Sequence, residues 1–185
     1  GSPTRYVHLV LEGWAARYKI LPDGARQITA FLFAGDFIGL TAGATYAFSA
    51  EAIEDTTVCR FRASEYRALA RERPSLEAAL LSRAMHELTA AQEQMLLLGR
   101  KTARERVASF LVTMLSRDPL RPSGDNAVRL PMTRSEIADY LGLTIETVSR
   151  ELTKLKTSGV IHAVYLHDLR IERPDRLKDM ANGAS

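Results

Sequence analysis

The sequence contains one cysteine among its 185 residues, which excludes a framework of intrachain disulfides. No apolar run approaches the roughly 20 residues that a transmembrane helix needs, and no signal peptide is visible. We therefore expect a cytoplasmic protein with no membrane partner. The opening Gly1, Ser2 and Pro3 resemble a cloning remnant rather than part of a domain.

Residue patterns typical of catalysis and metal binding are also missing. The four histidines, at positions 8, 86, 162 and 167, lack metal-ligand spacing. The sequence has neither a glycine-rich loop for phosphates nor an arrangement of Ser, His and Asp typical of nucleophilic catalysis. We therefore expect neither an enzyme nor a metal site in this chain.

What is abundant is apolar residues, and basic ones in the second half. The chain is 46% hydrophobic, enough to bury a core in one or two domains. Residues 100–185 hold 15 Lys/Arg against 11 Asp/Glu, whereas residues 1–99 hold 10 against 11. A basic surplus confined to the C-terminal half favours a nucleic-acid partner for that half.

Two short helices are predicted within that half. In "PMTRSEIADYLGL", residues 131–143, Thr133 and Glu136 have capping-box spacing, and Gly142 suits a left-handed helix end. In "TIETVSRELTKL", residues 144–155, Thr144 is a good N-cap and apolar residues recur at helical spacing. Two helices separated by a short turn with a glycine are typical of a helix-turn-helix.

The second helix carries polar residues suited to DNA. Glu146, Ser149, Arg150 and Thr153 project from one face, although such a face is usually only solvated. In a helix-turn-helix this helix enters the major groove, where arginine recognises guanine, glutamate accepts from cytosine, and serine suits either kind of base edge. Phosphates are expected to be contacted by the hydroxyls of Thr133, Thr144 and Thr147. Arg134 is also included among the residues expected to bind DNA. After Gly159, "VIHAVYLHDLRIER" predicts a two-stranded wing that turns at His167 and Asp168.

The N-terminal third is rich in β-forming residues. The stretches "YVHLVLEG" and "ARYKILPDGARQITAFLF" are predicted to pair as a hairpin, with Pro22, Asp23 and Gly24 as the turn. Further strands are expected in "YAFSAEAIEDTTVCRF". The fold class is therefore α+β, beginning with an antiparallel sheet rolled on itself.

One long helix is predicted over residues 74–99, from a proline to a glycine. A seam with alternating spacings of four and three is typical of a coiled coil, and it comprises Leu81, Met85, Leu88, Gln92 and Met95. This pattern favours a homodimer, which would present two DNA-recognising helices to a palindrome. The alternative is that the stripe packs on the chain's own β-roll.

These motifs resemble the Crp/Fnr family of transcription regulators over nearly the whole chain. "VHLVLEGWAARYKILPDGARQITAFLFAGDFIGL" is similar to the family's β-roll, "LLLGRKTARERVASFL" to the segment after its dimer helix, and "IETVSR" to the recognition helix of the Fnr and FixK branches. The resemblance implies a cupin-like jelly roll, truncated here at its N-terminus, in residues 1–73. It also implies a dimerisation helix in 74–99 and a winged helix-turn-helix in 100–185.

The resemblance further implies a dimeric regulator that recognises TTGAT-type half-sites on double-stranded DNA, works with RNA polymerase as an activator, and responds to oxygen or redox state. The cyclic-AMP-receptor branch has an arginine where this chain has Ile145, which argues against that branch's half-site. The competing class is a protein-interaction module that has kept a winged helix without specific DNA binding.

Members of the family use two sensory cofactors, a cyclic nucleotide and an iron–sulfur cluster, and each needs particular residues. The stretch "GDFIGLTAGATYAFSAEA" lacks the arginine and the glutamate of a cyclic-nucleotide cassette, so no nucleotide is expected. Gly35 and Asp36 are interpreted as a structural turn. Cys59 resembles the fourth ligand of the Fnr four-iron four-sulfur (4Fe–4S) cluster, whose other ligands would lie in an N-terminal extension of the full-length protein. Its alternatives are a buried strand residue, as in a cofactor-free FixK-like regulator, and a redox-sensing thiol.

Overall fold

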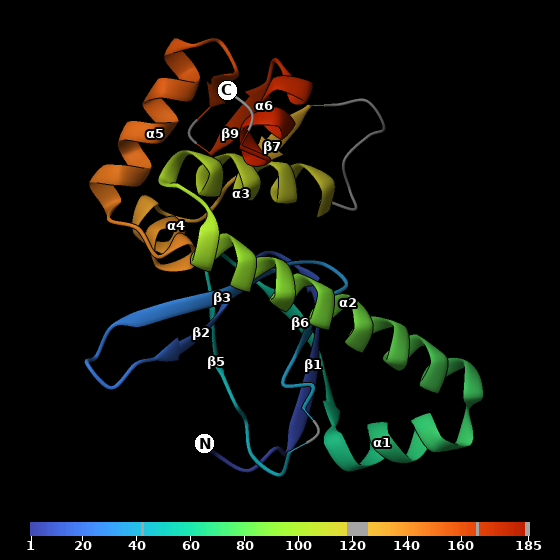
Figure 1. The fold of residues 1–185 in the computed structure, drawn as a ribbon. Helices are drawn as coiled ribbons and strands as arrows, with labels where there is room; N and C mark the ends of the chain where they lie inside the picture. Colours follow the sequence, from blue (N-terminus) through green and yellow to red (C-terminus); the bar gives the residue numbers. More distant parts are fainter. Residues whose placement is uncertain (42, 118–125, 166, 184–185) are drawn as a thin grey trace. The chain divides into compact units, whose positions relative to one another are not determined.

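The computed structural model describes residues 1–41, 43–117, 126–165 and 167–183 (Figure 1). The chain forms two compact units, Gly1–Gln94 and Met95–Ser185. The fold is mixed α and β, with N-terminal antiparallel sheets, a long helix and a C-terminal helix-turn-helix, as predicted. Across the described ranges, no helix is long and apolar enough to cross a membrane.

The N-terminal unit contains two antiparallel sheets of three strands. Their strand orders are β4-β1-β6 and β3-β2-β5. The strands are β1 (Tyr6–Glu12), β2 (Ala15–Ile20), β3 (Arg26–Leu32), β4 (Phe37–Ile38), β5 (Ser49–Ala52) and β6 (Thr57–Arg62). The core between them is apolar, since Val10, Ile28, Phe31 and Leu32 are at most 1% exposed.

The predicted N-terminal hairpin is confirmed for β2 and β3 only. Its turn is closed by a hydrogen bond from Leu21 N to Ala25 O of 2.8 Å, and Gly24 has a φ of 84°. The expectation that the first stretch joins the same hairpin is wrong, because β1 pairs with β4 and β6 instead. Alternating apolar residues identify a strand but do not identify the strand with which it pairs.

Two helices follow the sheets. They are α1 (Ala63–Glu72) and α2 (Pro74–Arg100). The long helix predicted over residues 74–99 is thereby confirmed, and it starts at Pro74, where the missing N–H would have no partner in any case. It ends where Thr102 and Glu105 exchange hydrogen bonds, Thr102 N to Glu105 Oε2 at 3.0 Å and Glu105 N to Thr102 Oγ1 at 3.4 Å, which starts the next helix.

The C-terminal unit packs its helices around a small sheet. Its elements are α3 (Ala103–Arg117), β7 (Ala127–Arg129), α4 (Arg134–Leu141), α5 (Ile145–Thr157), β8 (Ile161–Tyr165), β9 (Asp168–Ile171) and α6 (Pro174–Ala181). The residues that close its core are less than 2% exposed and include Phe110, Leu111, Ile137, Leu141 and Leu155.

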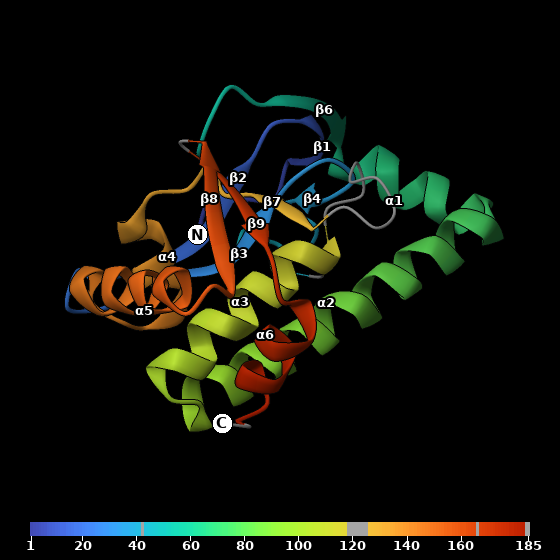
Figure 2. The same ribbon diagram turned by 90° about the horizontal axis from the view of Figure 1, so that it is seen from above.

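The predicted wing is present as the β8–β9 hairpin, but the two-stranded description is wrong. A third strand, β7, pairs with β9, giving the order β7-β9-β8 that Figure 2 shows from above. His167 lies in the turn, whereas Asp168 already begins β9, and Leu166 lies outside the described residues. A strand of three residues, Ala127–Arg129, is too short to give a periodic signal.

Candidate nucleic-acid interface

The first helix of the predicted helix-turn-helix begins with the expected capping box. Thr133 Oγ1 accepts from Glu136 N at 3.2 Å, and Glu136 Oε2 accepts from Thr133 N at 2.7 Å. Two of the amides at the start of α4 are thereby satisfied. Thr133 is exposed there, and Arg134, the first residue of α4, is half-buried. Burial lowers the pKa of the Arg134 guanidinium.

The helix ends at Gly142, also as predicted. Gly142 has φ 59° and ψ 44°, a left-handed conformation that side chains disfavour. The next residue, Leu143, donates its N–H to Ala138 O at 3.1 Å. Only Gly142, Leu143 and Thr144 separate α4 from α5, so the two helices are joined tightly (Figure 1).

The side chain of Arg106 in α3 stabilises this turn by hydrogen bonds, a role that the sequence does not predict. Its Nη1 donates to Leu141 O at 3.0 Å, its Nη2 to Leu98 O at 2.9 Å and its Nε to Lys101 O at 2.9 Å. One guanidinium thus caps carbonyls at the C-terminal ends of α2 and α4. Arg106 lies in a segment that resembles the family. Its role in capping the two helices becomes visible only in the structure, because folding brings its carbonyl acceptors together.

The second helix, α5, places the predicted polar residues on its exposed side. Thr144 is its N-cap and accepts from Thr147 N at 3.2 Å. The apolar side, with Val148, Leu152 and Leu155, is at most 3% exposed. Glu146, Ser149, Arg150 and Thr153 are all exposed. The amphipathic assignment of this helix is confirmed.

Five of the seven candidate residues lie in the cap and first two turns of α5. They are Thr144, Glu146, Thr147, Ser149 and Arg150. Thr147 Oγ1 accepts from Arg150 Nη2 at 3.4 Å. Thr133 and Arg134 form a second group, at the start of α4. Both groups combine hydroxyl or cationic side chains with the N-terminal amides of a helix, an arrangement that favours phosphate oxygens.

Ile145 adds an apolar contact to this surface. It is the first residue of α5 and is 46% exposed, next to Glu146. An exposed aliphatic side chain beside polar base-recognising groups can contact the methyl group of thymine. In the sequence, Ile145 argues only against the half-site of the cyclic-AMP-receptor branch, which has an arginine at this position.

The predicted seam of α2 is exposed in the single chain. Leu81 is 64% exposed, Met85 53%, Leu88 50% and Met95 73%, and Gln92 is exposed as well. For Leu81, Met85 and Leu88, this exposure excludes the alternative that they pack on the chain's own sheets. Apolar side chains in a regular row are expected to be covered by a partner.

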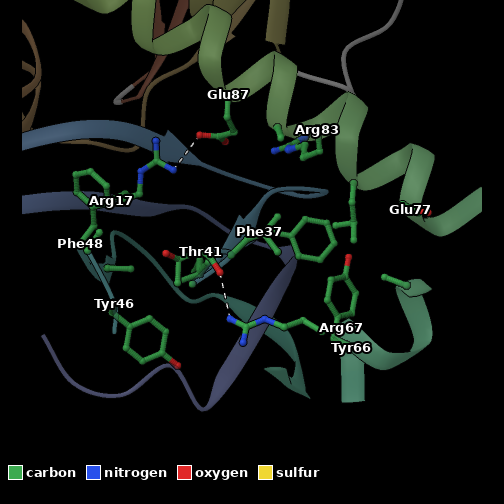
Figure 3. Close-up of a pocket in the computed structure, with 18 of the residues that line it drawn as sticks. Arg17, Phe37, Thr41, Tyr46, Phe48, Tyr66, Arg67, Glu77, Arg83 and Glu87 are labelled. Atoms are coloured by element: carbon green, nitrogen blue, oxygen red, sulfur yellow. Dashed lines mark hydrogen bonds and ion pairs between the residues drawn. The ribbon is translucent and has the colours of Figure 1, made fainter. Parts of the chain in front are cut away.

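The other side of α2 borders a cavity of about 590 Å³ in the N-terminal unit (Figure 3). Arg17 of β2 pairs with Glu87 of α2 at 2.9 Å, and Arg83 of α2 pairs with the buried carboxylate of Asp36. Arg67 of α1 donates to Thr41 O at 3.2 Å.

The stretch in which we expected no nucleotide cassette lines part of this cavity; its Ala42 lies outside the described residues. The sequence does not predict this cavity, because its arginines lie on β2 and on α1 and α2, which are far from β2 in the chain. Interpreting Asp36 as only a turn residue was incomplete. It does accept from Phe33 N at 3.1 Å within the turn, but it also pairs with Arg83.

Cys59 lies in β6 opposite Leu9 and is half-buried. Because Cys59 is only half-buried, the interpretation of it as a buried strand residue is wrong, and Val58 and Phe61 in the same strand are 40% and 36% exposed. Within the described part of the chain, no group of three or more His, Cys, Asp or Glu residues could hold a metal ion. The residues present therefore do not fit a 4Fe–4S cluster, which needs four ligands.

Comparison with families of known proteins gives two matches. Residues 105–180 match the Crp-like helix-turn-helix domain, and residues 1–73 match the cyclic nucleotide-binding domain. The two matches correspond to the recognition surface and to the N-terminal sheets.

Individual proteins agree with these matches. The chain is 43% identical over 175 residues to the transcriptional activatory protein AadR of Rhodopseudomonas palustris, covering 95% of this chain and 73% of that protein. It is 46% identical over 156 residues to the nitrogen fixation regulation protein FixK of Bradyrhizobium diazoefficiens, covering 84% and 66%. The solved structure of FixK2 from Bradyrhizobium japonicum has a TM-score of 0.91 at 40% identity, over 100% of this chain and 91% of that one.

Proposed function

Because the chain belongs to the Crp/Fnr family of transcription regulators, in its Fnr/FixK branch, we propose that it acts as a homodimer that recognises a TTGAT-type palindrome through α5. The observation that carries this proposal is the exposed set Glu146, Ser149 and Arg150 on a capped helix directly after the glycine turn. The family consists of transcription regulators and not enzymes.

Each residue of α5 has a base partner in this proposal. Arg150 donates two hydrogen bonds to O6 and N7 of the guanine in TTGAT, and Glu146 accepts from the N4 amine of a cytosine. Ser149 donates to, or accepts from, a neighbouring base edge. Ile145 contacts a thymine methyl, which suits a half-site that begins with two thymines.

Phosphate contacts set the position of α5 on the duplex. Thr133 and Arg134 at the start of α4, and Thr144 and Thr147 at the start of α5, offer hydroxyls, a cation and helix N-terminal amides. Such contacts hold the protein in register but do not distinguish sequences.

The dimer forms along the exposed seam of α2. Two copies related by a two-fold axis present two recognition helices about one helical turn apart, roughly 34 Å, as a palindrome requires. Bound there, the dimer activates transcription by contacting RNA polymerase.

The test is Arg150→Ala, compared with the unchanged protein on a TTGAT-N4-ATCAA palindrome and on a scrambled site of equal length. Loss of a bidentate guanine contact costs about 1 to 3 kcal/mol per half-site, so the mutant is expected to lose its preference for the palindrome while keeping its fold by circular dichroism. Thr157→Ala, at the exposed end of α5, is the matched control. An unchanged footprint and preference in Arg150→Ala would refute the assignment.

The competing function, a protein-interaction module without specific DNA binding, predicts a different result. It gives equal affinity for the palindrome and the scrambled site at every salt concentration. Specific binding that weakens steeply with salt excludes it, because salt dependence reports phosphate contacts.

For sensing, we propose that this chain binds DNA without a cofactor, as expected of a FixK-like regulator. Cys59 is one thiolate, and no described residues complete a cluster around it. The chain spans 66 to 73% of the length of the two relatives above, so an Fnr-like response to oxygen is a proposal about a longer protein.

Cys59→Ser in the longest available form of the protein separates these sensing modes. Iron, acid-labile sulfide and DNA affinity would be measured after anaerobic purification. Loss of iron and of anaerobic DNA binding indicates an Fnr-like cluster. Unchanged DNA binding of Cys59→Ser in both air and nitrogen indicates the FixK-like mode. A change in DNA binding with thiol oxidants that occurs in the unchanged protein and not in Cys59→Ser indicates a redox-active thiol.

A further inference from the structure

Among the described residues, only two charged side chains are buried, Asp36 and Glu151. Glu151 is 6% exposed and lies on the inner side of α5, beside Val148 and Leu152. Burying a carboxylate is unfavourable unless a cation or hydrogen-bond donors compensate it. Glu151 is also adjacent in sequence to the proposed guanine-recognising arginine, and the function proposed above gives it no role.

Two cations reach the Glu151 carboxylate. Lys154 Nζ lies 2.8 Å from Glu151 Oε1, and Arg150 Nε lies 3.5 Å from the same oxygen. Consecutive residues of a helix point about 100° apart and do not normally face each other. In this structure the Arg150 side chain nevertheless places its Nε beside Glu151.

A second contact involves Nη2 of the same guanidinium, which donates to Thr147 Oγ1 at 3.4 Å. With Nε directed toward Glu151 and one N–H of Nη2 directed to Thr147, Nη1 and the second N–H of Nη2 at the end of the guanidinium remain to meet O6 and N7 of guanine. The Arg150 side chain is 60% exposed, so this end is accessible.

We propose that Glu151 is a positioning residue for Arg150: its buried carboxylate fixes the guanidinium in the orientation that recognises guanine. The proposal rests on the function proposed above. It adds that discrimination at the guanine depends on an acid that does not touch DNA. An arginine held before binding loses less conformational freedom when it meets the base.

Electrostatic repulsion alone and positioning of Arg150 predict different effects of Glu151→Gln on DNA binding. A carboxylate near phosphates repels DNA, so Glu151→Gln should strengthen binding to all DNA if the charge is all that matters. If Glu151 positions Arg150, the same substitution should reduce the preference for the palindrome over a site in which adenine replaces the guanine of each half-site.

The full chain would be measured as unchanged protein, Glu151→Gln, Arg150→Ala and the double mutant, on both sites at several salt concentrations. We expect Glu151→Gln to lower the ratio of the two affinities at least about fivefold, within the range of one bidentate contact. In the Arg150→Ala background it should change the ratio no further, because the two residues act on the same contact. Lys154→Gln is the matched control, since it removes the other cation and leaves Arg150 beside Glu151.

An unchanged ratio in Glu151→Gln, together with a reduced ratio in Arg150→Ala, overturns this proposal and leaves the DNA-recognition function intact. An unchanged ratio in Arg150→Ala overturns both. If Glu151→Gln does not fold, the Nε–H resonance of Arg150 would be followed by NMR across the titration of Glu151 in the unchanged protein. A shift that tracks the carboxylate supports the contact, and no shift rejects it.

Discussion

At the start of α5, the backbone N–H of Glu146 and, to a smaller extent, the side chain of Thr144 lower the pKa of the Glu146 carboxyl group. The carboxyl group of an unfolded glutamate has a pKa of about 4.3. Because the folded pKa lies below that value, the stability from this contact is complete above the unfolded pKa. It is lost as the pH falls through the folded pKa.

We therefore predict that an NMR titration finds the Glu146 carboxyl pKa below its ordinary value, and that Thr144→Val raises it. The valine removes the hydroxyl donor and keeps the side-chain shape. Thr144→Ser keeps the hydroxyl and serves as the control. A Glu146 pKa that is the same in Thr144→Val and in the unchanged protein would show that the hydroxyl does not hold the carboxylate.

Thr133 provides a different prediction at the residue scale. Its hydroxyl caps α4 and is proposed to contact phosphate. Thr133→Val should weaken binding to the palindrome and to scrambled DNA by similar factors, because phosphate contacts carry no sequence information. It should also destabilise the fold by about 1 kcal/mol through the lost cap. Thr133→Ser should restore both, and a selective loss on the palindrome would instead place Thr133 at a base.

At the scale of elements, the turn between α4 and α5 depends on Gly142. A Cβ at this position would lie 3.3 Å from Leu98 Cδ2, and the φ of 59° is unfavourable for any side chain. Gly142→Ala should lower stability by roughly 1 to 2 kcal/mol from the backbone conformation, plus a contribution from crowding. Thermal unfolding would measure it.

Gly159→Ala is the matched control, with a φ of 64° and no atom within 4 Å of the added Cβ. It should lose only the backbone contribution. Equal losses for the two variants would mean that the Leu98 side chain moves aside without cost.

At the scale of the whole molecule, the dimer can be tested at the centre of the α2 seam. Leu88 is 50% exposed in the single chain, so Leu88→Asp should leave each subunit folded. In the dimer it would bury an unpaired charge, which costs several kcal/mol. We predict monomers by light scattering at micromolar concentration, and weaker binding to the palindrome. Ala90→Asp, exposed and outside the seam, should remain dimeric; an intact dimer with Leu88→Asp would place the interface elsewhere.

Cyclic AMP provides a second whole-molecule test. Arg17 and Arg83 border the cavity but already pair with Glu87 and Asp36, so a phosphate would have to displace a carboxylate. We predict that cyclic AMP changes neither the melting temperature nor the affinity for the palindrome, because a ligand that binds neither state shifts no equilibrium. A gain in DNA affinity with cyclic AMP would contradict the FixK-like and the Fnr-like sensing modes alike.

The sequence alone determined the features that depend on neighbouring residues. Thr133 with Glu136, Gly142, and Thr144 with the apolar spacing of α5 act within one helical turn, so their pattern is visible in the chain. The residues proposed to contact DNA were found in the same way, at the N-terminal ends of two consecutive helices. Pro22 to Gly24 likewise identified the β2–β3 turn.

Only the tertiary structure decided the features that join distant segments. Arg106 meets carbonyls of Leu98 and Leu141, and Arg17 meets Glu87, 70 positions away. β1 pairs with β6 instead of with the hairpin that follows it, and β7 completes the wing sheet. The burial of Glu151 depends on what covers the inner side of α5. Helical spacing and capping rules describe contacts within a few residues, whereas strand partners and the neighbours of a buried charge are set by packing of the whole chain.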